Sequence, residues 1–153
     1  MINKKIWGFI IVCLIVNICF MALIDYVKLP FPAITGKTLD VFISEDLNYS
    51  DLPTLHKDGY EVSINNLCTG FVAIFLLASI VIVQKAFKLT KKNWKQIVIF
   101  LIASIPVLFV VNLLRLYIIF EYSTKGTVEY LHIFGWFFVS GCILLMWYIF
   151  ENK

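Results

Sequence analysis

Asn65-Asn66-Leu67-Cys68-Thr69-Gly70-Phe71 is the stretch where a polar segment of more than forty residues ends and a hydrophobic run begins. A cysteine at such a boundary is expected at a membrane surface, at the N-terminal end of a helix that then enters lipid. A helix N-terminus carries partial positive charge and unpaired N–H groups, which stabilise an anion and lower the pKa of a thiol. Thr69 and Gly70 are small, so another chain could approach the sulfur closely. The stretch therefore predicts Cys68 as a nucleophile, with Thr69 and Gly70 as supporting residues.

The composition places the whole chain in a membrane. Of the 153 residues, 61% are hydrophobic and 15% are charged, and the mean hydropathy is +0.89. A water-soluble domain of this size could not hide so much apolar surface. We expect one integral membrane domain, residues 1–153, in the plasma membrane.

Four apolar runs are long enough to be membrane spans, and they predict an all-α membrane protein, a four-helix transmembrane bundle. The runs cover residues 6–24, 67–83, 97–120 and 131–150. The first run follows Lys4 and Lys5, so a cleaved signal peptide is the competing interpretation. We expect a retained span instead, because the run is longer than a usual signal core and Met21-Ala22-Leu23-Ile24 is a poor cleavage site.

Residues 25–66 differ in kind and predict a small extracytoplasmic cap over the mouth of the bundle. They hold three of the four prolines and most of the acidic residues. Leu39-Asp40-Val41-Phe42-Ile43 and Tyr60-Glu61-Val62-Ser63-Ile64 alternate in the way of half-buried strands, and Asp58-Gly59 is a turn signal. The cap is therefore compatible with a short antiparallel strand pair, a β-hairpin.

The distribution of charge predicts the orientation of the bundle. With both termini cytoplasmic, the inner segments hold eight lysines and one acidic residue, a net charge of +7. The outer segments hold five basic and nine acidic residues, a net charge of −4. This asymmetry follows the positive-inside rule. The five lysines between residues 84 and 96 lie between two spans, which favours a role in topology over binding of nucleic acid.

This topology brings three reactive side chains to one depth on the outer face. Cys68 opens the second span, Arg115 lies about one turn before the end of the third, and His132 opens the fourth. Taken singly, each has an ordinary explanation: Cys68 as a packing residue, Arg115 snorkelling to the headgroups, and His132 in the aromatic belt. Their shared depth favours function, because ionisable groups within a membrane are costly.

Together the three side chains have the chemistry of acyl transfer. A thiolate is the nucleophile, His132 accepts its proton and later protonates the leaving amine, and Arg115 stabilises the thiolate or the oxyanion. Asn112, one turn before Arg115, is placed to orient it. Glu129, three residues before His132, is placed either to hold the imidazole or to be a solvated loop acid. The chain offers only two histidines and no zinc or haem ligand set, so no metal or cofactor is expected.

These residues resemble the pattern of the exosortase/archaeosortase family. The resemblance covers roughly residues 60–140 and rests on Cys68-Thr69-Gly70, Asn112-x-x-Arg115 and His132, each at the end of a span. It implies a membrane cysteine transpeptidase with a Cys68–Arg115–His132 active site on the extracytoplasmic side. It also implies, as substrates, secreted proteins that end in a short motif, a hydrophobic span and a basic tail. Such enzymes cut through a thioacyl intermediate and pass the new C-terminus to a lipid-linked acceptor. Many members have more than four spans.

Two other functions remain open from the sequence. A small four-helix thiol–disulfide oxidoreductase would fit the size, but it needs a resolving cysteine, and the other cysteines all lie inside apolar runs: Cys13, Cys19 and Cys142. A non-enzymatic four-span protein would leave the shared depth of the three reactive residues unexplained.

Overall fold

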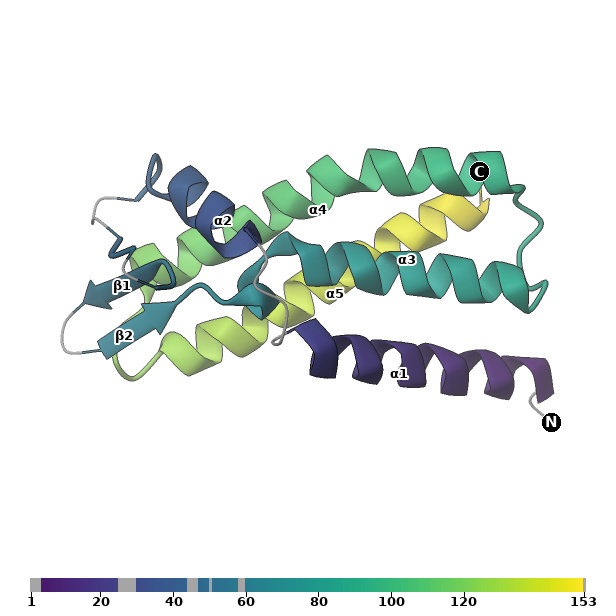
Figure 1. Ribbon diagram of the computed structural model, residues 1–153, viewed down its shortest axis with the longest axis horizontal. Coiled ribbons are helices and arrows are strands. Elements are labelled where there is room, and N and C mark those ends of the chain that lie inside the picture. The colour runs from purple at the N-terminus through teal and green to yellow at the C-terminus, as the bar shows by residue number, and fades with distance from the viewer. Residues whose placement is uncertain (1–3, 25–29, 44–46, 50, 58–59, 153) are drawn as a thin grey trace.

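The computed structural model describes residues 4–24, 30–43, 47–49, 51–57 and 60–152. Four long helices run along the molecule: α1 (Lys4–Ile24), α3 (Gly70–Ala86), α4 (Trp94–Tyr122) and α5 (Val128–Asn152). A small cap lies at one end of them (Figure 1), and its elements are α2 (Phe31–Leu39), β1 (Thr54–Lys57) and β2 (Tyr60–Ser63). Both ends of the chain and the α3–α4 connection lie at the opposite end of the molecule (Figure 1). We call these two ends the cap end and the terminal end.

The four predicted spans each coincide with one long helix, and the all-α membrane fold is confirmed. Helices α1, α4 and α5 are 21, 29 and 25 residues long and apolar enough to cross a membrane. Helix α3 is also apolar but has 17 residues, about 25 Å at 1.5 Å per residue. It begins at Gly70, three residues after the predicted start of the span, because Asn66–Cys68 form a separate 3-10 turn, η1.

The bundle is held together by close packing and by hydrogen bonds between helices. A Cβ atom at Gly70 would lie 3.2 Å from the Cα atom of Phe109, so glycine lets α3 approach α4. Helix α1 packs on α3, where Asn17 donates a hydrogen bond of 2.9 Å to the Ser79 hydroxyl. Helix α5 is joined to α3 where the Trp147 indole donates to Gln84.

Of the two strands predicted in the cap, one is present and one is not. Strand β2 lies in the predicted alternating segment at residues 60–64, and it pairs antiparallel with β1. The prediction of a strand at residues 39–43 is wrong, because Leu39 ends helix α2 and a turn follows. Leu39 lies in the core, but Val41 and Phe42 are 76% and 63% exposed, so the alternation does not correspond to one buried and one exposed face of a strand. The predicted turn at residues 58–59 lies outside the described residues.

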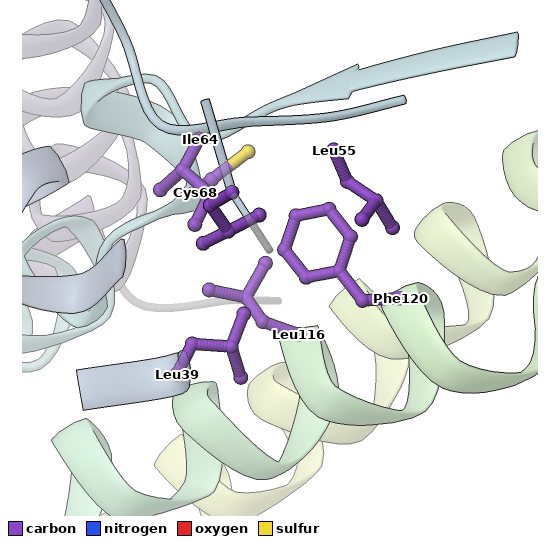
Figure 2. Packing of buried hydrophobic residues seen from close by; sticks show 7 residues of the cluster. Leu39, Leu55, Ile64, Cys68, Leu116 and Phe120 are labelled. Carbon is purple, nitrogen blue, oxygen red and sulfur yellow. The ribbon is translucent and has the colours of Figure 1, made fainter. Parts of the chain in front are cut away.

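The cap is fastened to the cap end of α4. The Tyr60 hydroxyl lies 2.7 Å from the Ser123 carbonyl oxygen, and the Lys57 ammonium donates to the carbonyls of Phe120 and Glu121. A lysine at these carbonyls also meets the negative end of the helix dipole. A hydrophobic cluster fills the space beneath the cap (Figure 2), and it consists of Leu39, Leu47, Leu55, Ile64, Cys68, Leu116 and Phe120.

Candidate active site

Arg115 is the buried charge around which the site is built. Its side chain in α4 is only 2% exposed. One terminal nitrogen, Nη2, lies 3.0 Å from His132 Nε2, and the other, Nη1, lies 3.4 Å from the Asn112 side-chain oxygen. Its Nε atom has no hydrogen-bond partner, and no carboxylate in the described part of the chain forms an ion pair with it. A buried cation without a counter-ion is costly, which indicates a site prepared for negative charge.

One face of α5 forms the other wall around Arg115. His132, Gly135 and Trp136 are three and four residues apart, so they lie on one side of the helix. The Trp136 ring centre is 4.6 Å from the guanidinium carbon, a cation–π contact. A Cβ atom at Gly135 would lie 2.7 Å from Arg115 Cγ, so only glycine admits the stem of the arginine.

Gly135 and Trp136 were not predicted from the sequence. The available signal was their spacing from His132, which places all three on one helical face. Tryptophan and glycine are also ordinary residues of a membrane helix, and this made the signal easy to miss.

The backbone of Cys68 is hydrogen-bonded to another residue of the site. It is the last residue of η1, and its N–H group donates to the Asn65 side-chain oxygen at 3.1 Å. Its carbonyl oxygen accepts a hydrogen bond of 2.6 Å from the Asn112 amide. Asn112 therefore bridges Cys68 and Arg115, in addition to the orienting contact with Arg115 that the sequence predicts.

The thiol itself is buried. The Cys68 side chain is 5% exposed, and its sulfur lies 3.9 Å from the Ser63 carbonyl oxygen. Burial raises the pKa of the Cys68 thiol, although a backbone hydrogen bond from Asn65 and the charge of Arg115 act in the opposite direction. The expectation of a thiol acidified by a helix N-terminus is therefore not met, since Thr69 separates Cys68 from the first residue of α3.

The remaining predicted residues have different surroundings. Thr69 is buried, and its hydroxyl donates to the Asn66 carbonyl; Gly70 faces α4. Their small size serves the packing of α3 and does not leave Cys68 open to another chain. Glu129 is exposed on the first turn of α5, and within the described residues it forms no hydrogen bond or ion pair with His132.

One further feature lies next to the site. An apolar groove opens between α2, α3 and α4 beside Thr69, and its other lining residues are Phe31, Ile34, Thr35, Gly70, Phe71, Ile74, Ile105 and Phe109. Within the described ranges, no group of three or more His, Cys, Asp or Glu side chains is arranged to hold a metal ion.

The structure thus brings Arg115 and His132 into direct contact and joins Cys68 to them through Asn112. A thiol, an imidazole and a guanidinium at one end of a bundle can supply a nucleophile, a proton acceptor and an oxyanion partner.

Comparison with known proteins adds one finding. A family model described as transmembrane exosortase matches residues 40–148, a range that includes most of the cap, the site and nearly all of the last three long helices. No curated protein and no solved structure matches the chain.

Proposed function

Because the chain belongs to the transmembrane exosortase family, we propose that it is a membrane cysteine transpeptidase. It cleaves a C-terminal sorting signal from secreted proteins through a thioacyl intermediate and transfers the new C-terminus to a lipid-linked acceptor. The protein lies in the plasma membrane, with the terminal end cytoplasmic and the cap end outside. The substrates are secreted proteins that end in a short motif, a hydrophobic span and a basic tail.

The proposed reaction assigns one role to each of the three side chains. Cys68 transfers its proton to His132, and the thiolate attacks the carbonyl carbon of the scissile peptide. Arg115 donates hydrogen bonds to the oxyanion of the tetrahedral intermediate. The imidazolium of His132 then protonates the leaving amine, which departs as the thioester forms. A nucleophilic group of the acceptor attacks the thioester, and the Cys68 thiol is regenerated.

The main support for this proposal is the environment of the Arg115 side chain. It is buried, has no carboxylate partner in the described part of the chain, touches His132, and keeps an unused Nε–H donor. A purely structural arginine would be expected to satisfy its donors within the fold, or to reach the headgroups.

Processing of a secreted substrate in cells tests the proposal. Cys68→Ala and His132→Ala are expected to leave the precursor uncut, whereas Cys142→Ala, in the middle of α5, is expected to process it normally. Arg115→Lys keeps the positive charge but loses the planar, multi-donor guanidinium, so the rate is expected to fall by about 10²-fold or more. Wild-type turnover by the lysine variant would mean that Arg115 contributes only its positive charge. Processing by Cys68→Ala would overturn the proposal.

A further inference from the structure

The contact between Arg115 and His132 determines where the imidazole proton is. A guanidinium has hydrogen-bond donors and no acceptor, and it keeps its proton in proteins. At 3.0 Å from Arg115 Nη2, the Nε2 atom of His132 must therefore accept the hydrogen bond with its lone pair. The ring proton lies on Nδ1, and His132 is neutral in this state.

The same contact occupies the atom that a general base needs. A base takes a proton with a free lone pair, and the lone pair of Nε2 is already engaged by Arg115. The other ring nitrogen, Nδ1, holds a proton and cannot accept one.

The thiol is engaged elsewhere as well. The Cys68 S–H group points to the Ser63 carbonyl oxygen, and no hydrogen bond joins the sulfur to His132 in the described part of the chain. Figure 2 shows the Cys68 side chain among Ile64, Leu116 and Phe120, beneath the cap. Nucleophile and base are both present, but neither is directed at the other.

We propose that this arrangement is a latched resting state, in which Arg115 blocks the base until a substrate oxygen draws the guanidinium away. The inference rests on the proposed function of the site. Arg115 has unused donors, including Nε–H, with which it can bind the carbonyl oxygen of the scissile peptide before it leaves His132. The cation–π contact with Trp136 does not depend on the hydrogen bond to His132, so it can still hold the guanidinium when that bond breaks.

Release of the latch has a simple proton balance. Once Nε2 is free, the S–H bond of Cys68 breaks and an N–H bond forms at Nε2. The products are a thiolate and an imidazolium that carries protons on both nitrogens, and the net charge of the site is unchanged. Arg115, now on the carbonyl oxygen, is in place for the oxyanion. One movement therefore activates the nucleophile and completes the oxyanion site.

The first test is the tautomer of His132 by ¹⁵N NMR without substrate. The chain has two histidines, so His56→Gln leaves His132 as the single imidazole signal. His56 is exposed in β1 and pairs with Glu61 on the surface of the hairpin, so the exchange does not touch the site. The latch predicts a protonated Nδ1 and an unprotonated Nε2. A proton on Nε2 would overturn it.

The second test is the rate at which iodoacetamide alkylates Cys68 without substrate, located by peptide mass spectrometry. If Arg115 only stabilises the thiolate, Arg115→Met makes alkylation slower. The latch predicts the opposite, a rate several-fold higher, because the freed Nε2 can take the thiol proton. An unchanged or slower rate contradicts the latch.

A double variant separates a freed base from a loosened fold. Arg115→Met combined with His132→Ala is expected to lose the faster alkylation, because the base is gone. If the higher rate persists in the double variant, Cys68 has only become more exposed and the latch is wrong. None of these readouts uses turnover, so failure of the latch leaves the proposed function standing, and failure of substrate processing leaves the tautomer result standing.

Discussion

Arg115 is positioned by contacts that differ in kind, and each constrains a different part of the side chain. Gly135 makes room for the stem, Trp136 makes a cation–π contact with the guanidinium, and Asn112 and His132 meet its terminal nitrogens. The contacts to His132, Gly135 and Trp136 come from a single turn of α5. The placement of the charge therefore depends on the packing of α5 against α4 as much as on Arg115 itself.

Gly135→Ala tests this dependence at the smallest scale. The added methyl group would overlap Arg115 Cγ and Nε, so the guanidinium must shift, and activity is expected to fall by about tenfold to a hundredfold. Stability is expected to fall by at most about 2 kcal/mol, because overpacking costs about 1–3 kcal/mol while alanine gains about 1 kcal/mol over glycine within a helix. Substrate processing and a thermal unfolding curve measure the two effects.

Gly141→Ala is the matched control, since it lies in the same helix and a Cβ atom there would meet nothing within 4 Å. It is expected to keep full activity. Equal activity of the two variants would mean that Gly135 does not position Arg115.

Arg115 and His132 stand out in the sequence because ionisable residues are rare in apolar helices. Cys68 stands out by its position at the start of a span, since the other three cysteines lie inside apolar runs. Asn112 followed from its helical spacing to Arg115, and the structure gives it a second contact, to the Cys68 carbonyl. Glu129 satisfied the same kind of spacing rule but lies on the exposed side of its turn. Spacing predicts which residues share a face, and only packing decides which face meets the site.

At the scale of elements, the cap and the end of α4 form one unit around Cys68. The hydroxyl of Tyr60 in β2 reaches the carbonyl and hydroxyl of Ser123 just after α4, and both distances are 2.7 Å. The neighbouring Ser63 carbonyl accepts the Cys68 S–H hydrogen bond. The hairpin therefore covers Cys68 and is itself held by α4.

Tyr60→Phe removes that connection without removing the ring. Loss of one such hydrogen bond is worth about 0.5–1.5 kcal/mol, enough to increase opening of the hairpin by up to about tenfold. We expect faster amide hydrogen exchange in β2 and faster alkylation of Cys68, with an unchanged bundle. Tyr130→Phe is the control, since Tyr130 is 75% exposed on α5. The same exchange rates in both variants would contradict a cap fastened through Tyr60.

The cap also shows why one strand was predicted correctly and the other was not. Both alternating segments have the period of a strand, but β2 has a partner in β1, which lies only two residues before it in the chain. At residues 39–43 the chain turns instead, and the Asp40 carboxylate accepts hydrogen bonds from the Leu47 N–H group and the Tyr49 hydroxyl. These hydrogen bonds join Asp40 to residues seven and nine positions further along the chain. They cannot be inferred from the alternation of five neighbouring residues.

At the scale of the whole molecule, the ends of the helices agree with the charge pattern. Both termini and the lysine-rich α3–α4 connection lie at the terminal end, and the cap lies at the other end with the α4–α5 connection (Figure 1). The two groups of segments are the ones whose net charges are +7 and −4. This agreement supports the proposed orientation, with the active site outside.

Labelling of intact cells with a membrane-impermeant maleimide tests the orientation. Lys125→Cys, in the exposed α4–α5 connection, is expected to react from outside. Lys91→Cys, in the α3–α4 connection, is expected to react only after the cells are broken. The parent chain provides the background from the native cysteines. Labelling of Lys91→Cys in intact cells would place the site on the cytoplasmic face and exclude secreted substrates.

The central claim is that Cys68 forms a thioester with the substrate, and trapping that bond tests it most directly. Wild-type protein in membranes with a substrate is expected to give a covalent adduct that neutral hydroxylamine cleaves. Cys68→Ala is expected to give no adduct, and His132→Ala little or none, because the thiol then lacks its proton acceptor. An adduct that reducing agent releases, or one that persists in Cys68→Ala, would contradict the account.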